Sequence, residues 1–252
     1  MRGFAAGRAD HYSELRPLRF AAVFAAVIAW FVVAPHLPGL SRWPDIVLVS
    51  FAVMPVTLLL VPLGLPILRY GWRPVVFGAA VCALAAFAFS EAGWGLPANF
   101  AKLFAAVLAG WSFLELFEQL SWVVIVACVI PFVDAISVWR GPTHSITTHH
   151  FHVYLDVAIA FVVPAGRAAY LGPPDVLFYA LFLAAAARWG LRVWGTWIAT
   201  TFMYGITIVI ANAVDVGGLP ALPFLSFAFL LANADVLWAR LRPRSASSPE
   251  RC

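Results

Sequence analysis

Apolar runs long enough to cross a lipid bilayer dominate this chain and restrict it to a membrane fold. A transmembrane helix needs about 20 predominantly apolar residues, and 63% of this sequence is hydrophobic whereas 11% is charged. Backbone groups in lipid must be hydrogen-bonded internally, so only helices or a closed barrel can span it. The period-two alternation of a barrel strand is absent. The sequence therefore predicts an all-α, polytopic membrane protein and excludes an ordinary soluble globule.

The pattern of apolar runs predicts about eight transmembrane helices. The first run is interpreted as a retained span, because its polar leader contains acidic residues and no small-residue cleavage site follows it. Prolines inside the second run predict kinks or an early end of that helix. These prolines are Pro55, Pro62 and Pro66. The predicted spans are residues 18–35, 46–68, 74–89, 100–117, 120–139, 173–188, 193–214 and 222–238.

The predicted helices fall into two groups between polar ends. A basic leader and a basic, disordered tail flank an amino-terminal helical part of four spans and a carboxy-terminal helical part that holds the candidate chemistry. In order, these are residues 1–17, 18–119, 120–238 and 239–252. No internal repeat and no soluble domain are apparent in the sequence.

The distribution of basic residues predicts the orientation in the membrane. With eight spans and a cytoplasmic amino terminus, twelve arginines lie on the inner side and four basic residues on the outer side. Cytoplasmic loops are enriched in Lys and Arg, so both termini are expected in the cytoplasm. The net charge of +4 is explained by contact with anionic lipid, and no nucleic-acid partner is needed. The outer residues are Arg42, Lys102, Arg140 and Arg167.

Composition also indicates a source. Arginine is used almost to the exclusion of lysine, and Ala, Gly and Pro are abundant. This pattern favours a prokaryote with a GC-rich genome, and hence a plasma-membrane location.

Two aspartates, Asp134 and Asp175, lie in stretches that are otherwise apolar enough for lipid. A charged side chain at the centre of a membrane costs about 2.5–3.5 kcal/mol on insertion scales, so such residues usually have a function. Asp134 lies near the end of one predicted helix and Asp175 near the start of the next, which places them at similar depth. Two adjacent carboxyls share a proton, so one can act as base and the other as acid on a bound water. Spacing alone leaves open a proton or ion pathway, or capping of a helix by Asp175.

Two further segments accompany the aspartates. Pro220 and Pro223 are expected to keep Leu219 and Leu222 out of the α region, leaving an extended segment with unpaired backbone groups, although a plain helix start is the alternative. Residues 153–163 are too short to span the membrane, and their β-branched content predicts a strand or a re-entrant segment.

Three sequence segments, PFVDAISVW, LGPPDVLFY and GLPALPFLSFAF, occur in this order on successive late spans. Together they resemble the motifs of the presenilin and signal peptide peptidase family of intramembrane aspartyl proteases, over about residues 131–229. The resemblance implies a presenilin-like helical bundle in which Asp134 and Asp175 are catalytic. It also implies a substrate-binding role for the residues at the family's Gly-x-Gly-Asp and Pro-Ala-Leu positions, namely Gly172, Pro174, Pro220, Ala221 and Leu222.

This sequence departs from the family pattern at three points. Val133 stands where the family has a tyrosine, and Pro174 replaces the glycine before the second aspartate. Loss of the tyrosine removes a possible hydrogen bond near the aspartates. Proline is compatible with the first turn of a helix but stiffens it, so substrate choice is expected to change. The predicted span count is one fewer than the family's usual nine.

The resulting hypothesis is an aspartic endopeptidase that cleaves transmembrane segments of membrane proteins or signal-peptide remnants. The predicted orientation matches signal peptide peptidase and favours substrates with a cytoplasmic amino terminus. One alternative is a transporter or ion pathway that uses the two aspartates and a helix broken at Pro220. Another alternative is an inactive relative of the family that binds transmembrane helices without cutting them; Pro174, which replaces the motif glycine, motivates this alternative.

No cofactor and no metal are predicted. A pH-responsive loop is preferred to a metal site for the four histidines between the two aspartates. Asp156 nearby is expected to be solvated rather than catalytic. The histidines are His144, His149, His150 and His152.

Overall fold

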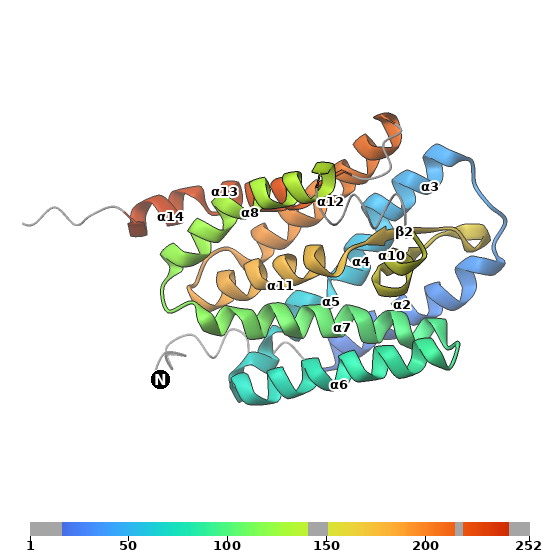
Figure 1. The fold of residues 1–252 in the computed structure, drawn as a ribbon, viewed down its shortest axis with the longest axis horizontal. Coiled ribbons are helices and arrows are strands. Elements are labelled where there is room, and N and C mark those ends of the chain that lie inside the picture. The colour runs from blue at the N-terminus through green and yellow to red at the C-terminus, as the bar shows by residue number, and fades with distance from the viewer. Residues whose placement is uncertain (1–16, 141–150, 215–218, 242–252) are drawn as a thin grey trace, which may run out of the picture.

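The computed structural model describes residues 17–140, 151–214 and 219–241. It is mostly helical, as the sequence predicts, with one small sheet. Figure 1 shows an elongated bundle in which the long helices run roughly along its longest axis, with α11 (Pro173–Arg188) in the middle. The site residues discussed below lie around the first turn of this central helix.

The first half of the chain forms four long helical segments. The second of these is composite, and begins with α3, continues through a π-helical turn into α4 and α5, and ends in a 3-10 turn. In chain order the elements are α2 (Pro17–Val33), α3 (Arg42–Leu48), the π-helical turn (Val49–Val53), α4 (Met54–Leu58), α5 (Leu60–Gly64), the 3-10 turn (Leu65–Tyr70), α6 (Trp72–Glu91) and α7 (Gly95–Phe113).

The second half contains the candidate site. It begins with α8, continues through a short helix and a two-stranded sheet, and ends with the central helix and three more helices. These elements are α8 (Leu120–Arg140), α10 (Phe151–Val157), β1 (Ile159–Val162), β2 (Ala168–Leu171), α11, α12 (Val193–Val214), α13 (Leu222–Ala232) and α14 (Ala234–Leu241).

Within the described residues, six helices are long and apolar enough to cross a membrane, and the bent pair α13 and α14 could be a seventh. The remaining predicted span is α11, whose 16 residues correspond to about 24 Å of helix, less than the roughly 30 Å hydrocarbon core. The integral-membrane class is therefore supported, and the count of eight stays a prediction.

The prolines of the second predicted span change the helix type without ending the segment. It continues from Arg42 to Tyr70 as one stretch of membrane length, but passes through π, α and 3-10 geometry. Proline lacks an N–H group and its ring pushes away the preceding turn, which explains the irregularity. The segment is thus irregular, the predicted kinks stay a prediction, and the alternative of an early end is wrong.

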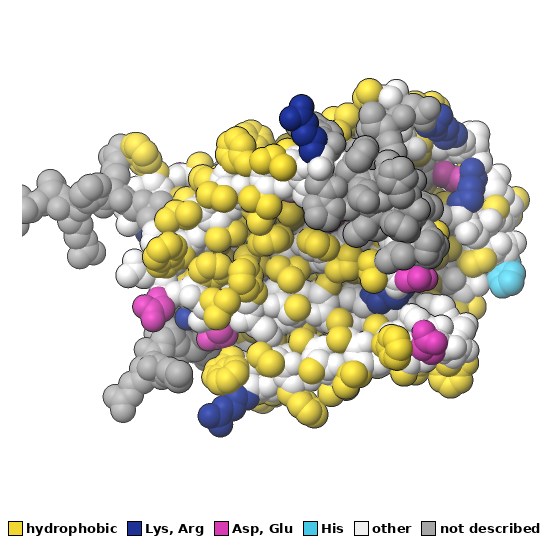
Figure 2. Space-filling view, viewed as in Figure 1, with side chains coloured by type: hydrophobic (Ala, Val, Ile, Leu, Met, Phe, Trp, Pro, Cys, Tyr) yellow, Lys and Arg dark blue, Asp and Glu magenta, His cyan; other side chains and the backbone are white. Residues whose placement is uncertain are grey.

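The outward faces of several helices carry large apolar side chains. On α6, Phe77 and Leu84 are each 71% exposed, and on α8, Phe132 is also 71% exposed. Figure 2 shows one face of the bundle covered largely by hydrophobic side chains, with most charged groups toward its two ends. Contiguous apolar surface of this kind is rare on soluble monomers, and its natural solvent is lipid.

The central helix α11 is the best-packed element of the bundle. Its residues from Tyr179 to Ala186 are fully buried, and Phe182 stacks on Phe229 of α13 with ring centroids 4.6 Å apart. On its other side, α7 approaches so closely that a Cβ atom on Gly110 would lie 2.2 Å from the carbonyl oxygen of Leu177. Only glycine permits this backbone contact.

The segment between the aspartate-bearing helices is a helix followed by a hairpin. The strand predicted across residues 153–163 is confirmed only for β1, because residues 151–157 form α10. β1 pairs antiparallel with β2, a second strand that is not among the elements predicted from the sequence. The hairpin is tied to α3 by an ion pair between Arg167 and Asp45.

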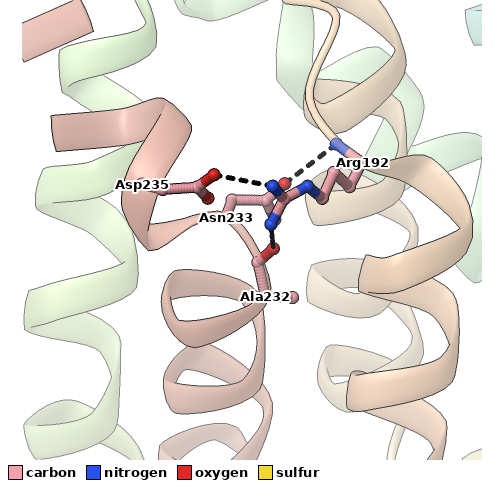
Figure 3. A network of polar contacts seen from close by, with 4 residues as sticks. All are labelled: Arg192, Ala232, Asn233 and Asp235. Carbon is pink, nitrogen blue, oxygen red and sulfur yellow. Dashed lines mark hydrogen bonds and ion pairs between the residues drawn. The ribbon is translucent and has the colours of Figure 1, made fainter. Parts of the chain in front are cut away.

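A sharp bend separates α13 from α14. The two helices meet at 68° around Asn233, which is fully buried. Its side-chain oxygen accepts the N–H of Arg192 at 2.9 Å, and its amide donates to the hydroxyl of Thr196 at 2.8 Å. The guanidinium of Arg192 also binds Asp235 at 2.6 Å, as Figure 3 shows. These bonds fix the end of α13 against the start of α12.

Candidate active site

Asp134 is held by the start of α13. It lies on α8, one turn after Pro131, and is half-buried. Its Oδ2 atom accepts the backbone N–H of Leu222 at 3.1 Å. The first N–H groups of a helix have no partner within the helix, so a carboxylate there is stabilised both by the hydrogen bond and by the helix dipole.

Asp175 occupies the first turn of α11. Gly172 precedes this helix, and its backbone N–H donates to Oδ2 of Asp175 at 3.3 Å, so the carboxyl caps its own helix. Pro173 and Pro174 lie between them and have no N–H to donate. The helix start therefore has few donors of its own, and the Asp175 side chain is fixed by the glycine amide.

The fold places Asp134 and Asp175 within electrostatic range of each other. α8 contacts both α11 and α13, and the charges of the two carboxyl groups act on each other. Each carboxyl accepts a backbone N–H from a helix start, and each side chain is half-buried rather than sealed. This arrangement keeps two partly accessible acids within electrostatic range in an otherwise apolar bundle.

The Pro-Ala-Leu segment lies inside the bundle beside Asp134. Pro220, Ala221 and Leu222 are all buried. The prediction that Leu222 stays out of the α region is wrong, because Leu222 is the first residue of α13. The helix tolerates Pro223 in its first turn, where the missing N–H costs no bond. The polar partner that this segment was expected to need is Asp134.

The two positions that depart from the family motifs both face outward. Val133 is 53% exposed, so its side chain points away from the buried face of α8. Pro174 is also exposed. Changes at these positions therefore alter what an approaching molecule meets, and leave the backbone bonds of the two aspartates in place.

The hairpin leads directly into the site. One edge of β1 is occupied by side chains: Asn99 donates to the carbonyl of Ala160 at 3.0 Å and accepts its N–H at 2.7 Å, and Trp30 donates to the carbonyl of Val162 at 2.9 Å. The outer edge of β2, at Ala168 and Tyr170, receives no hydrogen bond from any other described residue. β2 ends one residue before Gly172, so this edge borders Asp175.

A groove also reaches the start of α11. It has a volume of about 1310 Å³ and runs between α6, α7, α10 and α11, with Pro173 and Pro174 in its lining. Its walls contain seven alanines, whose small side chains leave room for another helix to approach. The groove is thus mainly apolar and lies beside one of the two aspartates.

Tyr154 of α10 lies near Asp175. Burial raises the pKa of the Tyr154 phenol to about 12, with a smaller contribution from the negative charge of Asp175. The phenol is therefore protonated at neutral pH. Asp156, two residues further, is exposed, as expected for a solvated residue.

The histidine cluster lies at the edge of the described residues. His144, His149 and His150 lie outside the described residues, and the side chain of His152 is not described. Across the described parts of the chain, no cluster of His, Cys, Asp and Glu could hold a metal ion.

Three important residues were not identified from the sequence. Gly110 allows α7 to contact α11, Asn99 closes one edge of the hairpin, and Tyr204 donates to the carbonyl of Asp175. Only Tyr204 has a sequence signal: with Thr196 and Thr200 it forms a polar stripe at four-residue spacing on an apolar helix, which indicates one buried face.

Comparison with known proteins finds no matching family model, no similar curated protein and no similar solved structure. The inference of function therefore depends on the site itself and on the motifs in the sequence.

Proposed function

We propose that this protein is an intramembrane aspartic endopeptidase of the presenilin and signal peptide peptidase type. The observation that carries the proposal is that Asp134 and Asp175, on two different helices, lie within electrostatic range of each other, while Asp134 is bonded to the amide of Leu222. A capping role explains the hydrogen bond of each aspartate separately, but gives no reason for two acids to meet in an apolar bundle, where each charge is costly.

The chemistry follows from a shared proton. Like charges in contact do not both ionise readily, so one carboxyl is a base while its partner keeps a proton. The ionised carboxyl takes a proton from a bound water, and the water oxygen attacks the peptide carbonyl carbon. The other carboxyl gives its proton to the carbonyl oxygen, forming a tetrahedral intermediate. Cleavage of the C–N bond, with proton transfer to nitrogen, yields an acid and an amine.

The outer edge of β2 is suited to hold the scissile segment. A helical substrate hides its carbonyl carbons within its hydrogen-bonded turns, so it must unwind before hydrolysis. Strand addition to an exposed sheet edge replaces the lost backbone bonds, and Asn99 and Trp30 leave the β2 edge as the accessible one. We propose that the substrate chain pairs with Ala168 and Tyr170, close to Asp175.

The alanine-lined groove is suited to hold the part of the substrate that stays helical. It is apolar, its small side chains permit close helix packing, and it continues to Pro173 and Pro174 at the start of α11. We propose that a transmembrane helix of the substrate lies here. Pro174, exposed in this lining, then contacts the substrate near the cleavage site.

The proposal is tested by incubating the purified protein with a panel of model transmembrane peptides and identifying products by mass spectrometry. The wild type is expected to cut at least one peptide within its apolar segment, with a bell-shaped pH profile that belongs to the carboxyl pair. Asp134→Asn and Asp175→Asn should each abolish cleavage while the protein stays folded. Equal activity of the wild type and both variants contradicts the assignment.

A further inference from the structure

A buried tyrosine, Tyr204, is hydrogen-bonded to one of the two proposed catalytic aspartates, Asp175. Tyr204 lies on α12 and is only 1% exposed. Its hydroxyl donates to the backbone carbonyl of Asp175 at 2.6 Å, and its phenol is within electrostatic range of both Asp175 and Asp134. A buried tyrosine hydroxyl needs a polar partner, but this choice of partner places it at the residue proposed to carry out the chemistry.

The packing of α12 holds Tyr204 in this position. Next to it, a Cβ atom on Gly205 would lie 2.9 Å from the carbonyl oxygen of Ser50, in the π-helical turn of the second segment. α12 is thus in backbone contact with that turn on one side. On the other side, the rings of Tyr204 and Tyr179 are 5.7 Å apart. The phenol therefore has little freedom to leave the carbonyl.

The bond matters because the first turn of α11 has few others. Pro173 and Pro174 donate nothing, so the turn is held by the mutual bonds of Gly172 and Asp175. The hydroxyl of Tyr204 adds a tie from a different helix. Rotation of this turn would change the direction of the Asp175 carboxyl relative to Asp134.

We propose that Tyr204 is a positioning residue for the aspartate pair: its hydrogen bond to the Asp175 carbonyl fixes the first turn of α11 and so aims the carboxyl at Asp134. The inference rests on the proposed function only for its effect on catalysis. The effect on the Asp175 carboxyl follows from the geometry alone.

The structure offers a matched control in Tyr179. It is also a fully buried tyrosine, and its hydroxyl is hydrogen-bonded to Thr201 at 3.0 Å, so Tyr179→Phe removes the same atom in a similar environment. It leaves the Asp175 carbonyl bond intact. A general loss of stability caused by removing a buried hydroxyl should therefore appear in both variants.

The test compares Tyr204→Phe, Tyr179→Phe and the wild type in two measurements. The first is peptide cleavage, and the second is the infrared spectrum of the carboxyl groups in protein labelled with ¹³C at aspartate. The Asp175→Asn variant identifies which carboxyl band belongs to Asp175. Tyr204→Phe is expected to lower kcat roughly tenfold, as for loss of one buried hydrogen bond, to leave KM unchanged, and to shift both the pH profile and the Asp175 band. Tyr179→Phe should resemble the wild type in kcat, in KM, in the pH profile and in the Asp175 band.

The outcomes separate this inference from the proposed function. A shifted Asp175 band in Tyr204→Phe, in a protein that cleaves no peptide, supports the positioning role and contradicts the protease. An Asp175 band and pH profile that match the wild type overturn the positioning role, as does an equal change in Tyr179→Phe.

Discussion

At the scale of single residues, the backbone around the two aspartates is more informative than their side chains. Each carboxyl is bound by the N–H at the start of a helix, from Gly172 for Asp175 and from Leu222 for Asp134. The amides of a Gly-x-x-Asp and a Pro-Ala-Leu segment thus have a direct physical use, which is to hold two acids in an apolar region. The side chains of Val133 and Pro174 face outward and take no part in holding the two acids.

Pro174 provides a prediction about specificity. It is exposed and lines the groove. Pro174→Gly adds backbone freedom next to Asp175 but removes neither the Gly172 bond nor the Tyr204 bond that hold this residue, so Asp175 should stay in place. We expect a broader or shifted set of cleavage products, with the total rate on a good substrate changed by no more than a few fold. Product mapping across the peptide panel measures this.

Two outcomes revise the role of Pro174. Identical products from both proteins remove it from substrate selection. A wild type that cuts nothing, together with a Pro174→Gly variant that cuts, makes the natural protein an inactive relative that binds transmembrane helices.

At the scale of elements, the contact of α7 with α11 decides where Asp175 lies. Gly110 is in backbone contact with Leu177, only two residues after Asp175. The stretch of α11 from Tyr179 to Ala186 is buried by its neighbours, so the helix cannot move away from α7 without disturbing them. The helix that carries one of the aspartates is therefore positioned by a glycine on a helix that carries neither.

Gly110→Ala is expected to be strongly disruptive. The new methyl group would lie 2.2 Å from a carbonyl oxygen, so α11 must shift, at a cost of about 1–3 kcal/mol in stability for overpacking. Cleavage should fall with the displacement of Asp175. Thermal unfolding in detergent and the peptide assay measure the two effects.

Gly95→Ala is the control on the same helix. A Cβ atom there meets nothing within 4 Å, so stability and activity should stay at or slightly above the wild-type level, since alanine favours the helix. If Gly110→Ala behaves like Gly95→Ala, the helix contact does not fix the site.

At the scale of the whole molecule, the charge distribution predicts the orientation in the membrane. The connection between α6 and α7 and the connection between α7 and α8 lie at opposite ends of α7. Ala92 and Glu118 are exposed in these connections, so they report on opposite sides. The positive-inside rule places Ala92 outside the cytoplasm and Glu118 within it.

Cysteine labelling tests this orientation. In a variant whose Cys82, Cys128 and Cys252 are replaced, an impermeant thiol reagent added to intact cells should label Ala92→Cys and spare Glu118→Cys. Both should react after the membrane is permeabilised, which controls for reactivity. The opposite pattern reverses the orientation and, with it, the expected preference for substrates with a cytoplasmic amino terminus.

The sequence was sufficient where the physics is local along the chain. Hydrophobicity over about 20 residues selects helices in a membrane, so the long helices and the polar turns between them could be predicted. Proline restricts its own backbone and that of the preceding residue, so the irregular second segment could also be anticipated. The cost of a carboxylate in lipid singled out Asp134 and Asp175 without any contact being known.

The tertiary structure decided what depends on residues distant in sequence. Leu222 binds Asp134 across 88 positions, and Asn99 bonds Ala160 across 61. No periodicity encodes such pairs. The strand–helix division of residues 151–162 and the existence of β2 depend likewise on what those segments pack against, since β propensity is strongly context-dependent. The identity of the candidate aspartates was thus available in the sequence, whereas their pairing and the tyrosine bonded to Asp175 arise only when helices separated along the chain pack together.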